Sequence, residues 1–354
     1  MAAPRPAAKA FADAMQRRPD GVMPHDLFIP KRLLGPAPLV VALHGCGQTT
    51  ADFAAGTRLN DAADRHGAIV VYPAQTKAAN TSGCWNWFLP EHQTRRLGEP
   101  AAILRLIEHL AQQQTIDRSR VVVTGLSAGG AMAAILAEQA PDVFAGVGIV
   151  AGVALHASHD VASAFAAMAG RHTTHPAKGA QATAPPARDF ARNTGVPTPA
   201  LHPLVAQLAA RSSHPLGTVA RAHDGAKAPE NQTFPRTRTA TGVDGPQTAR
   251  EDFGRMRVMV WTGTSDSTVS PSNATELVRQ FAALLGLDAA HVETSAYGTA
   301  AEVARWRDAG GVRIEAWTVR DMGHAWSGGS PRGSYTYPAG PNTSEAMLDF
   351  LLAP

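Results

Sequence analysis

The chain has 354 residues, of which 44% are hydrophobic and 17% are charged, and this composition excludes a chain that is disordered throughout. No apolar run reaches the roughly 18 to 20 residues that a spanning helix needs, so we expect no membrane span. The net charge is +3, and the basic excess lies within residues 152–256 without forming a cluster. Nucleic-acid binding is therefore not expected.

The N-terminal part, residues 1–36, is expected to form a short helix and a linker, with residues 25–30 extended. Its first 21 residues contain no apolar segment of the length typical of a signal peptide. We therefore expect either a cytoplasmic protein or a mature form whose leader is absent.

The next part of the chain alternates buried strands with helices. Continuous apolar runs of strand length occupy residues 38–45, 68–73, 120–127 and 144–152, and helical patterns occupy residues 50–66, 99–114 and 128–139. Strands that alternate with helices are joined by right-handed crossovers and pair in parallel. The sequence thus predicts an α/β fold with a doubly wound, mostly parallel sheet.

This alternation stops over residues 152–256, which contain 10 of the 26 prolines and 7 of the 14 histidines. A connection of that length is typical of a functional lid or of a partly disordered segment. We therefore predict one catalytic domain, residues 37–354, that carries a lid-like insertion. After the insertion we expect strands at 257–263, 302–307 and 312–319 and helices at 272–285 and 344–352.

The strongest chemical signal is the pentapeptide Gly125-Leu126-Ser127-Ala128-Gly129. It follows a buried strand and opens a helix of small residues, which is the setting of a nucleophile elbow with Ser127 as nucleophile. Glycine is expected at positions 125 and 129 because side chains there would collide with neighbouring backbone. The alternative is a tight turn with an idle serine.

A serine nucleophile needs a general base and an acid that orients it, in the chain order serine, acid, histidine. His324 lies in a Gly-flanked loop after a predicted strand and is our candidate base, whereas His291 precedes a polar stretch. A structural role for this loop histidine is the alternative. Asp266 directly follows a predicted strand and is our candidate acid, while Asp321 is better explained as a turn residue.

Acyl transfer also needs donors for the developing oxyanion. One is the backbone N–H of Ala128, and the second is expected from the LHGCGQ loop, which places Cys46 beside the elbow. His44 and Gly45 are expected to shape this loop. A catalytic thiol at Cys46 is disfavoured because the serine and its partners already account for the chemistry.

The segment SGCWNWF carries two tryptophans. If it is extended, Trp85 and Trp87 project from one side and offer an apolar surface to an acyl chain or aromatic ring. Packing in the core under a loop is the alternative. Trp326, two residues after the candidate base, is a further expected substrate contact. Cys84 can pair with Cys46 in a disulfide, or both can stay reduced in a reducing compartment.

Five motifs occur in the order LHGCGQ, SGCWNWF, GLSAGGAMA, GTSDSTV and GHAWSGG. In this order the chain resembles the polyhydroxybutyrate depolymerase family of esterases, related to feruloyl and acetylxylan esterases. The resemblance covers about residues 37–170 and 255–352. It implies an α/β-hydrolase fold, a triad of Ser127, Asp266 and His324, no cofactor or metal, and an extracellular or periplasmic location.

The implied reaction is hydrolysis of short-chain hydroxyalkanoate polyester or oligomer through an acyl-enzyme, so the expected partner is a polyester or small ester. A feruloyl or acetylxylan esterase shares the same triad and differs in its pocket. A serine peptidase is also conceivable on this fold. The non-enzymatic alternative is a catalytically silent binding protein of the hydrolase fold.

Overall fold

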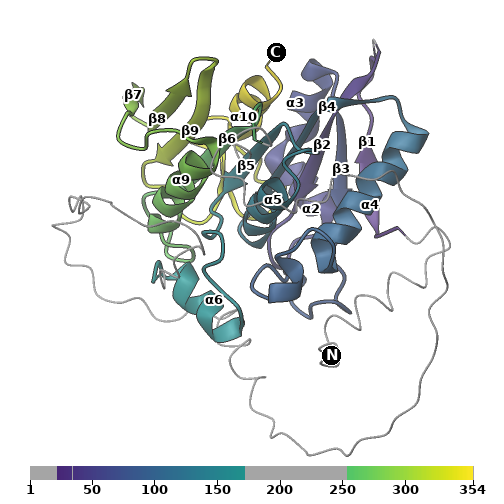
Figure 1. Cartoon of the computed structure of the whole chain (residues 1–354), viewed down its shortest axis with the longest axis horizontal. Coiled ribbons are helices and arrows are strands. Elements are labelled where there is room, and N and C mark those ends of the chain that lie inside the picture. The colour runs from purple at the N-terminus through teal and green to yellow at the C-terminus, as the bar shows by residue number, and fades with distance from the viewer. Residues whose placement is uncertain (1–21, 34, 172–252, 354) are drawn as a thin grey trace, which may run out of the picture. The chain divides into compact units, whose positions relative to one another are not determined.

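The computed structural model describes residues 22–33, 35–171 and 253–353, and a nine-stranded sheet runs through them (Figure 1). The strand order is β1-β3-β2-β4-β5-β6-β9-β8-β7. The strands are β1 (His25–Phe28), β2 (Ala37–Leu43), β3 (Ile69–Pro73), β4 (Ile116–Leu126), β5 (Gly146–Val150), β6 (Arg257–Gly263), β7 (Glu293–Tyr297), β8 (Ala301–Asp308) and β9 (Gly311–Val319).

The six central strands, from β3 to β9 in the sheet order, are all parallel, and antiparallel pairing is confined to the edges. Parallel strands place their carboxyl ends at one edge of the sheet. The loops that follow β2, β4, β6 and β9 therefore start at the same edge, which confirms the predicted mostly parallel sheet.

Helices cover both faces of this sheet. They are α2 (Thr50–Thr57), α3 (Leu59–His66), α4 (Gly98–Gln113), α5 (Ala128–Gln139), α6 (Val161–Met168), α9 (Ser272–Leu285) and α10 (Thr343–Leu351). Helices α4, α5 and α9 pack on the face that carries Leu39, Val123 and Val260, while α2, α3 and α10 pack on the face that carries Val40 and Val122. Neighbouring strand residues are buried on opposite faces, which explains the continuous apolar runs in the sequence.

Some elements differ from the predictions or were not predicted, among them the short strands β10 (Trp326–Ser327) and β11 (Thr336–Tyr337). The helix expected over residues 50–66 is two helices, because Arg58 between them adopts a left-handed conformation with φ of 56°. The extended segment expected at residues 25–30 contains β1, which pairs antiparallel with β3. Strand β7 was not predicted because all five of its residues are exposed and show no apolar pattern.

Most of the predicted insertion, residues 172–252, lies outside the described residues, as do residues 1–21 of the expected N-terminal helix. The described start of the insertion is a loop after β5 followed by α6, which Asp160 begins with a capping box. Asn273 and Gln280 of α9 hold this loop by accepting the N–H groups of Ala154 and Leu155. The domain boundaries expected from the sequence stay predictions.

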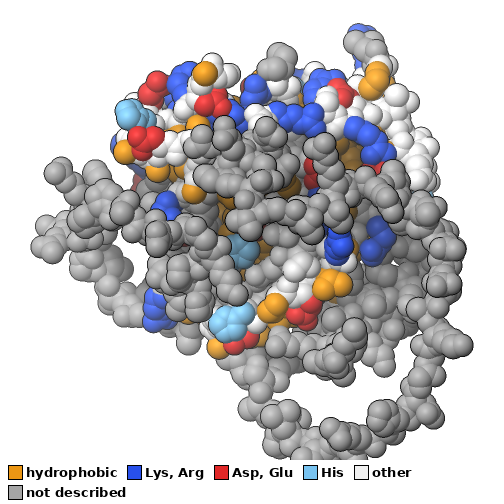
Figure 2. Space-filling model, in the orientation of Figure 1, with side chains coloured by type: hydrophobic (Ala, Val, Ile, Leu, Met, Phe, Trp, Pro, Cys, Tyr) orange, Lys and Arg blue, Asp and Glu red, His pale blue; other side chains and the backbone are white. Residues whose placement is uncertain are grey.

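Basic and acidic side chains are interspersed on the described surface in the view of Figure 2. Several pair directly, as Arg118 does with Glu108 at 2.7 Å and Arg58 with Asp61 at 3.1 Å. Exposed pairs of this kind each contribute little to stability. None of the described helices combines the length and hydrophobicity that a membrane span requires.

Candidate active site

Ser127 sits in the turn that joins the end of β4 to the start of α5. Its backbone has φ of 58° and ψ of −119°, a conformation that is strained for a residue with a side chain. The Ser127 N–H donates to the Val150 carbonyl at 2.9 Å and its carbonyl accepts from Ala131 at 2.9 Å. These bonds hold the turn, and Ser127 remains partly exposed between buried neighbours.

The glycines of the turn have no room for a side chain. An added Cβ at Gly125 would lie 2.4 Å from the Gly129 carbonyl, and one at Gly129 would lie 2.1 Å from the Leu43 carbonyl oxygen. These approaches confirm that positions 125 and 129 require glycine. They also pack the elbow directly against the end of β2.

Asp266 and His324 lie in the loops that follow β6 and β9, at the same edge of the sheet as Ser127. The Asp266 side chain is fully buried, and its Oδ2 is 2.8 Å from His324 Nδ1. Its Oδ1 accepts the N–H groups of Thr268 and Val269, each at 2.9 Å. Three donors thus fix the carboxylate, and the His324 ring is bound through Nδ1, which leaves Nε2 for chemistry.

The two loops meet closely because Gly263 has no side chain: an added Cβ there would lie 2.1 Å from the Met322 carbonyl oxygen. Asp321 is exposed, has φ of 57° and donates its N–H to Thr264, so it is a turn residue. His291 is exposed and pairs with Asp288 at 2.7 Å. Among the described residues, neither Asp321 nor His291 forms a hydrogen bond with Asp266 or His324.

The loop after β2 contains Gly45 and Cys46 and lies against the elbow. An added Cβ at Gly45 would lie 3.7 Å from Ser127 Cβ. Cys46 forms a disulfide with Cys84, so the loop is tied to the segment that contains the two tryptophans. In the described residues, no hydrogen bond uses the backbone N–H of Cys46 or Ala128. Both donors therefore remain available for a ligand oxygen.

His44 braces this loop from within. Its Nδ1 lies 2.8 Å from the Gly45 carbonyl oxygen, and its Nε2 accepts the N–H of Gln75 at 3.1 Å. Burial lowers the pKa of His44, against the opposing effect of the bond to Gly45. The neutral imidazole thus has one donor and one acceptor nitrogen, and both are used, as expected for a residue that shapes the turn.

A buried acid, Glu99 at the start of α4, holds the segment that contains Cys84 and the two tryptophans. Its carboxylate accepts the backbone N–H of Asn86 at 2.8 Å, the Asn86 side chain at 2.6 Å and the Gln75 side chain. His92 Nδ1 lies 3.4 Å from the same carboxylate. Glu99 therefore joins the loop that contains Gln75 to the segment that contains Asn86.

Of the three tryptophans expected at the substrate, Trp85 and Trp326 are buried in the core, which for Trp85 is the alternative expected from the sequence. Trp85 has no exposed surface and its Nε1–H donates to the His44 carbonyl at 3.0 Å. Trp326 is 1% exposed, donates to Ser344 Oγ at 3.1 Å and packs edge-on against Phe53. Trp85 thus supports the loop after β2, whereas Trp326 packs between α2 and α10.

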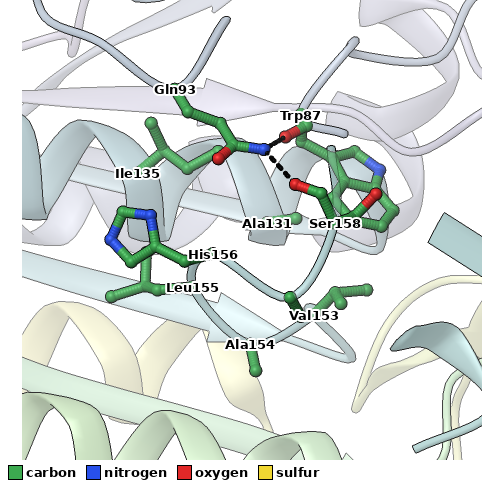
Figure 3. A pocket seen from close by; sticks show the side chains of 10 residues that line it. Trp87, Gln93, Ala131, Ile135, Val153, Ala154, Leu155, His156 and Ser158 are labelled. Atoms are coloured by element: carbon green, nitrogen blue, oxygen red, sulfur yellow. Dashed lines mark hydrogen bonds between the residues drawn. The ribbon is translucent and has the colours of Figure 1, made fainter. Parts of the chain in front are cut away.

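Trp87 is nearly buried and lines a small cavity over α5 (Figure 3). Figure 3 shows Gln93 at the rim, where its Nε2 donates to the carbonyls of Trp87 and Ser158 at 2.9 and 2.8 Å. The cavity volume is about 10 Å³, room for a single water molecule at most. A contact between Trp87 and substrate stays a prediction.

The sequence reasoning missed Gln48, Asp52, Ser334 and Tyr335. Burial alone would raise the pKa of Asp52, but hydrogen bonds from Ser334 and Gln48 outweigh it and lower this pKa. Tyr335 is 38% exposed, has φ of 53°, and its ring lies edge-on to His324 with centroids 6.3 Å apart. Gln48 stands inside the LHGCGQ motif, but no local pattern points to its partner nearly 300 residues later.

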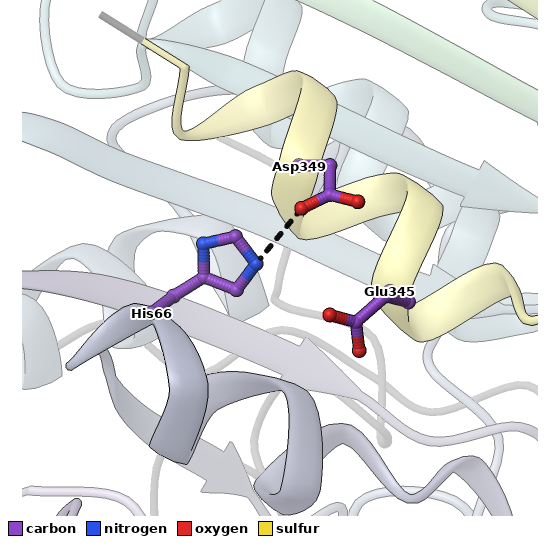
Figure 4. A group of neighbouring side chains, drawn as sticks. All are labelled: His66, Glu345 and Asp349. Atoms are coloured by element: carbon purple, nitrogen blue, oxygen red, sulfur yellow. Dashed lines mark ion pairs between the residues drawn. The ribbon is translucent and has the colours of Figure 1, made fainter.

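One group of described side chains has the composition of a metal site: His66 on α3 with Glu345 and Asp349 on α10 (Figure 4). His66 Nε2 is 3.2 Å from an oxygen of Asp349. Glu345 pairs through both oxygens with Arg65, which neutralises its charge. The group is accounted for by ion pairs that hold α10 on α3.

The structure resembles a solved acetyl xylan esterase from Aspergillus awamori, with a TM-score of 0.55, 17% identity, and coverage of 85% of this chain and 88% of that one. Similarity at this level establishes a shared fold, that of the α/β-hydrolases. The predicted fold class is therefore confirmed.

Two curated relatives extend the comparison to sequence. Poly(3-hydroxyalkanoate) depolymerase C of Paucimonas lemoignei is 29% identical over 296 residues, which cover 84% of this chain and 56% of that protein. Feruloyl esterase B of Neurospora crassa is 33% identical over 168 residues, which cover 47% and 56%. The chain thus spans a little over half the length of these relatives.

A family model described as esterase PHB depolymerase matches residues 25–214. The matched range includes the loop after β2, the disulfide and the turn that carries Ser127. The pair of Asp266 and His324 lies beyond it and rests on the geometry given above. The match covers more than half of the sequence, and the chain therefore belongs to the esterase PHB depolymerase family.

Proposed function

We propose that the chain is a serine esterase in which Ser127 is the nucleophile, His324 the general base and Asp266 the orienting acid. The observation that carries this proposal is the 2.8 Å contact between His324 and the buried Asp266, at the sheet edge where the strained elbow presents Ser127. Strands β4, β6 and β9 run in parallel, so the three residues that follow their carboxyl ends lie at one edge of the sheet, which supports the proposal.

In the acylation step, His324 Nε2 takes the proton of Ser127 Oγ while the oxygen attacks the ester carbonyl carbon. Asp266 accepts from Nδ1 and stabilises the imidazolium that forms. The N–H groups of Ala128 and Cys46 donate to the oxyanion, and each such donor contributes roughly 3 kcal/mol. Collapse of the intermediate breaks the ester bond, and His324 returns the proton to the leaving alkoxide.

Deacylation repeats the sequence with water. His324 takes a proton from water, the resulting hydroxide attacks the acyl carbon, and the second intermediate releases the acid as His324 reprotonates Ser127. The net reaction converts one ester and one water into an alcohol and a carboxylic acid. The chain's own groups carry every proton, so the proposal requires no cofactor.

For the substrate, we propose a short-chain hydroxyalkanoate polyester or its oligomers. The relative named a poly(3-hydroxyalkanoate) depolymerase matches 84% of the chain, whereas the relative named a feruloyl esterase matches 47%. A feruloyl or acetylxylan esterase is the second candidate. The disulfide supports an extracellular or periplasmic location, since such bonds persist in oxidising compartments.

Hydrolysis of p-nitrophenyl butyrate by Ser127→Ala tests the reaction. We expect loss of turnover by several orders of magnitude with an unchanged circular dichroism spectrum, because only the nucleophile oxygen is removed. Ser119→Ala, at the exposed start of β4, is the matched control and should keep full activity. Retained hydrolysis in Ser127→Ala would contradict the proposal.

A panel of hydroxybutyrate oligomers, methyl ferulate and acetylated xylan then separates the candidate substrates. We expect kcat/KM to be highest for the oligomers. A preference for methyl ferulate or acetylated xylan would favour the second candidate. Binding of an oligomer without any turnover would instead favour the non-enzymatic alternative.

A further inference from the structure

Three side chains, Gln48, Asp52 and Ser334, form a hydrogen-bonded group that we call the Gln48 network. Gln48 is 7% exposed, and its Oε1 accepts the N–H of Gly45 at 2.9 Å. Its Nε2 donates to Asp52 Oδ2 at 2.9 Å and faces the Ser334 carbonyl and hydroxyl oxygens at 3.2 and 3.1 Å. Both ends of the carboxamide are therefore in use.

Asp52, in the first turn of α2, closes the network. Its Oδ1 accepts the Ser334 N–H at 2.9 Å, and its Oδ2 accepts the Ser334 hydroxyl at 2.6 Å. The network thus joins three segments: the loop after β2, the start of α2, and the loop between the short strands β10 (Trp326–Ser327) and β11 (Thr336–Tyr337). Charge-assisted bonds of this kind are about twice as strong as neutral ones.

One end of the network acts on the loop after β2, which contains Gly45 and Cys46 and which we call the oxyanion loop. Gly45 lies against the elbow, where an added Cβ would approach the Leu126 carbonyl oxygen at 3.5 Å and Ser127 Cβ at 3.7 Å. The bond from its N–H to Gln48 fixes the His44–Gly45 peptide, which directly precedes the peptide that carries the Cys46 N–H. The carbonyl of the next peptide, which carries the Cys46 N–H, accepts the Gln48 backbone N–H at 3.3 Å. Gln48 thus binds both peptides of Gly45, and through them it sets the direction of the Cys46 N–H, the second proposed oxyanion donor.

The other end acts on the histidine. Ser334 precedes Tyr335, whose backbone is held at φ of 53° and whose carbonyl accepts the Trp326 N–H at 2.8 Å. The Tyr335 ring lies at 80° to the His324 ring. A positive φ persists only where surrounding contacts enforce it. The bonds of Ser334 to Asp52 hold the residue next to Tyr335, and they therefore help to keep the Tyr335 ring against His324.

We propose that Gln48, Asp52 and Ser334 are positioning residues that hold the loop after β2 and the Tyr335 ring, which contacts His324, in place for catalysis. The inference rests on the proposed function and extends it to residues that do not touch the reacting atoms. A misplacement of about 1 Å in such a site can cost roughly 100-fold in rate. The network is therefore expected to act on turnover and not only on stability.

The test uses Gln48→Ala and Asp52→Asn in the full chain, with active sites counted by the burst of p-nitrophenol. The count removes any effect of unfolded protein. We expect kcat per titrated site to fall about 10- to 100-fold while KM changes less than about threefold. Asp160→Asn, which removes a capping carboxylate on α6 away from these loops, should keep the kcat of the wild type.

Ser334→Ala keeps the backbone bond to Asp52 and serves if the stronger variants fold poorly. We expect a smaller fall of about three- to tenfold, and less than additive loss when it is combined with Gln48→Ala. A kcat per titrated site within twofold of wild type in all three single variants would overturn the inference. Failure of the proposed function is separate, because wild type itself would then show no burst.

Discussion

The two sides of the candidate site are built in different ways. On the side of Asp266 and His324, the acid is held within its own loop by N–H groups two and three residues later, and Gly263 lets this loop touch the loop of the histidine. On the oxyanion side, the loop after β2 is held by a disulfide across 38 residues and by Gln48, whose partner Ser334 is 286 residues away.

Because of this difference, substitutions on the two sides should affect turnover and stability in different proportions. Changes on the side of Asp266 and His324 remove chemistry while the fold stays intact. Changes on the oxyanion side loosen long-range bonds, so they should cost stability and turnover together. The following predictions separate these outcomes, from the largest effect to the smallest.

The largest effect is expected from Asp266→Asn. The amide cannot stabilise the imidazolium and favours the wrong tautomer of His324, so kcat should fall about 10⁴-fold. The free energy of unfolding should change by less than the activation free energy does. Esterase assays and urea denaturation measure the two quantities. Asp321→Asn is the matched control, three residues before the histidine, and should leave kcat unchanged. Equal losses in both variants would count against the assignment of Asp266.

Removal of the disulfide should have the next largest effect. A cross-link over 38 residues restricts the unfolded chain by an amount worth about 4 kcal/mol in the entropic model, and measured values are often lower. The double variant Cys46→Ser, Cys84→Ser should therefore unfold at a lower urea concentration, with a loss of about 2–4 kcal/mol. Reductant should lower the stability of the wild type and not that of the variant. Identical unfolding curves would contradict the prediction.

A smaller effect is expected from Glu99→Gln. The amide group replaces one acceptor by a donor and leaves a buried N–H of Asn86 or Gln75 without its partner, at a cost of about 1–3 kcal/mol. Urea unfolding measures this loss. Glu108→Gln, on the same helix but exposed and paired with Arg118, should cost less than about 1 kcal/mol. A loss at Glu108 as large as at Glu99 would show that the buried network adds nothing.

Features that depend on local sequence patterns could be predicted, whereas features that depend on contacts between distant segments could not. The buried strands and the elbow are local patterns, and Asp266 and His324 follow strands directly, so chain order alone leads to them. Strand β7 has no apolar pattern, and the break at Arg58 depends on tertiary packing. The inward orientation of Trp85 depends on its bond to the His44 carbonyl, and Ser334 meets Gln48 only in the folded chain.

The most direct test of the central claim is labelling by a fluorophosphonate probe, followed by peptide mapping. We expect one label per molecule on Ser127 in the wild type. Labelling of His324→Ala should be at least about a thousandfold slower, because the base activates the serine. Labelling of His291→Ala should proceed at the wild-type rate. Absence of a label on Ser127, or equal rates in His324→Ala and wild type, would contradict the account.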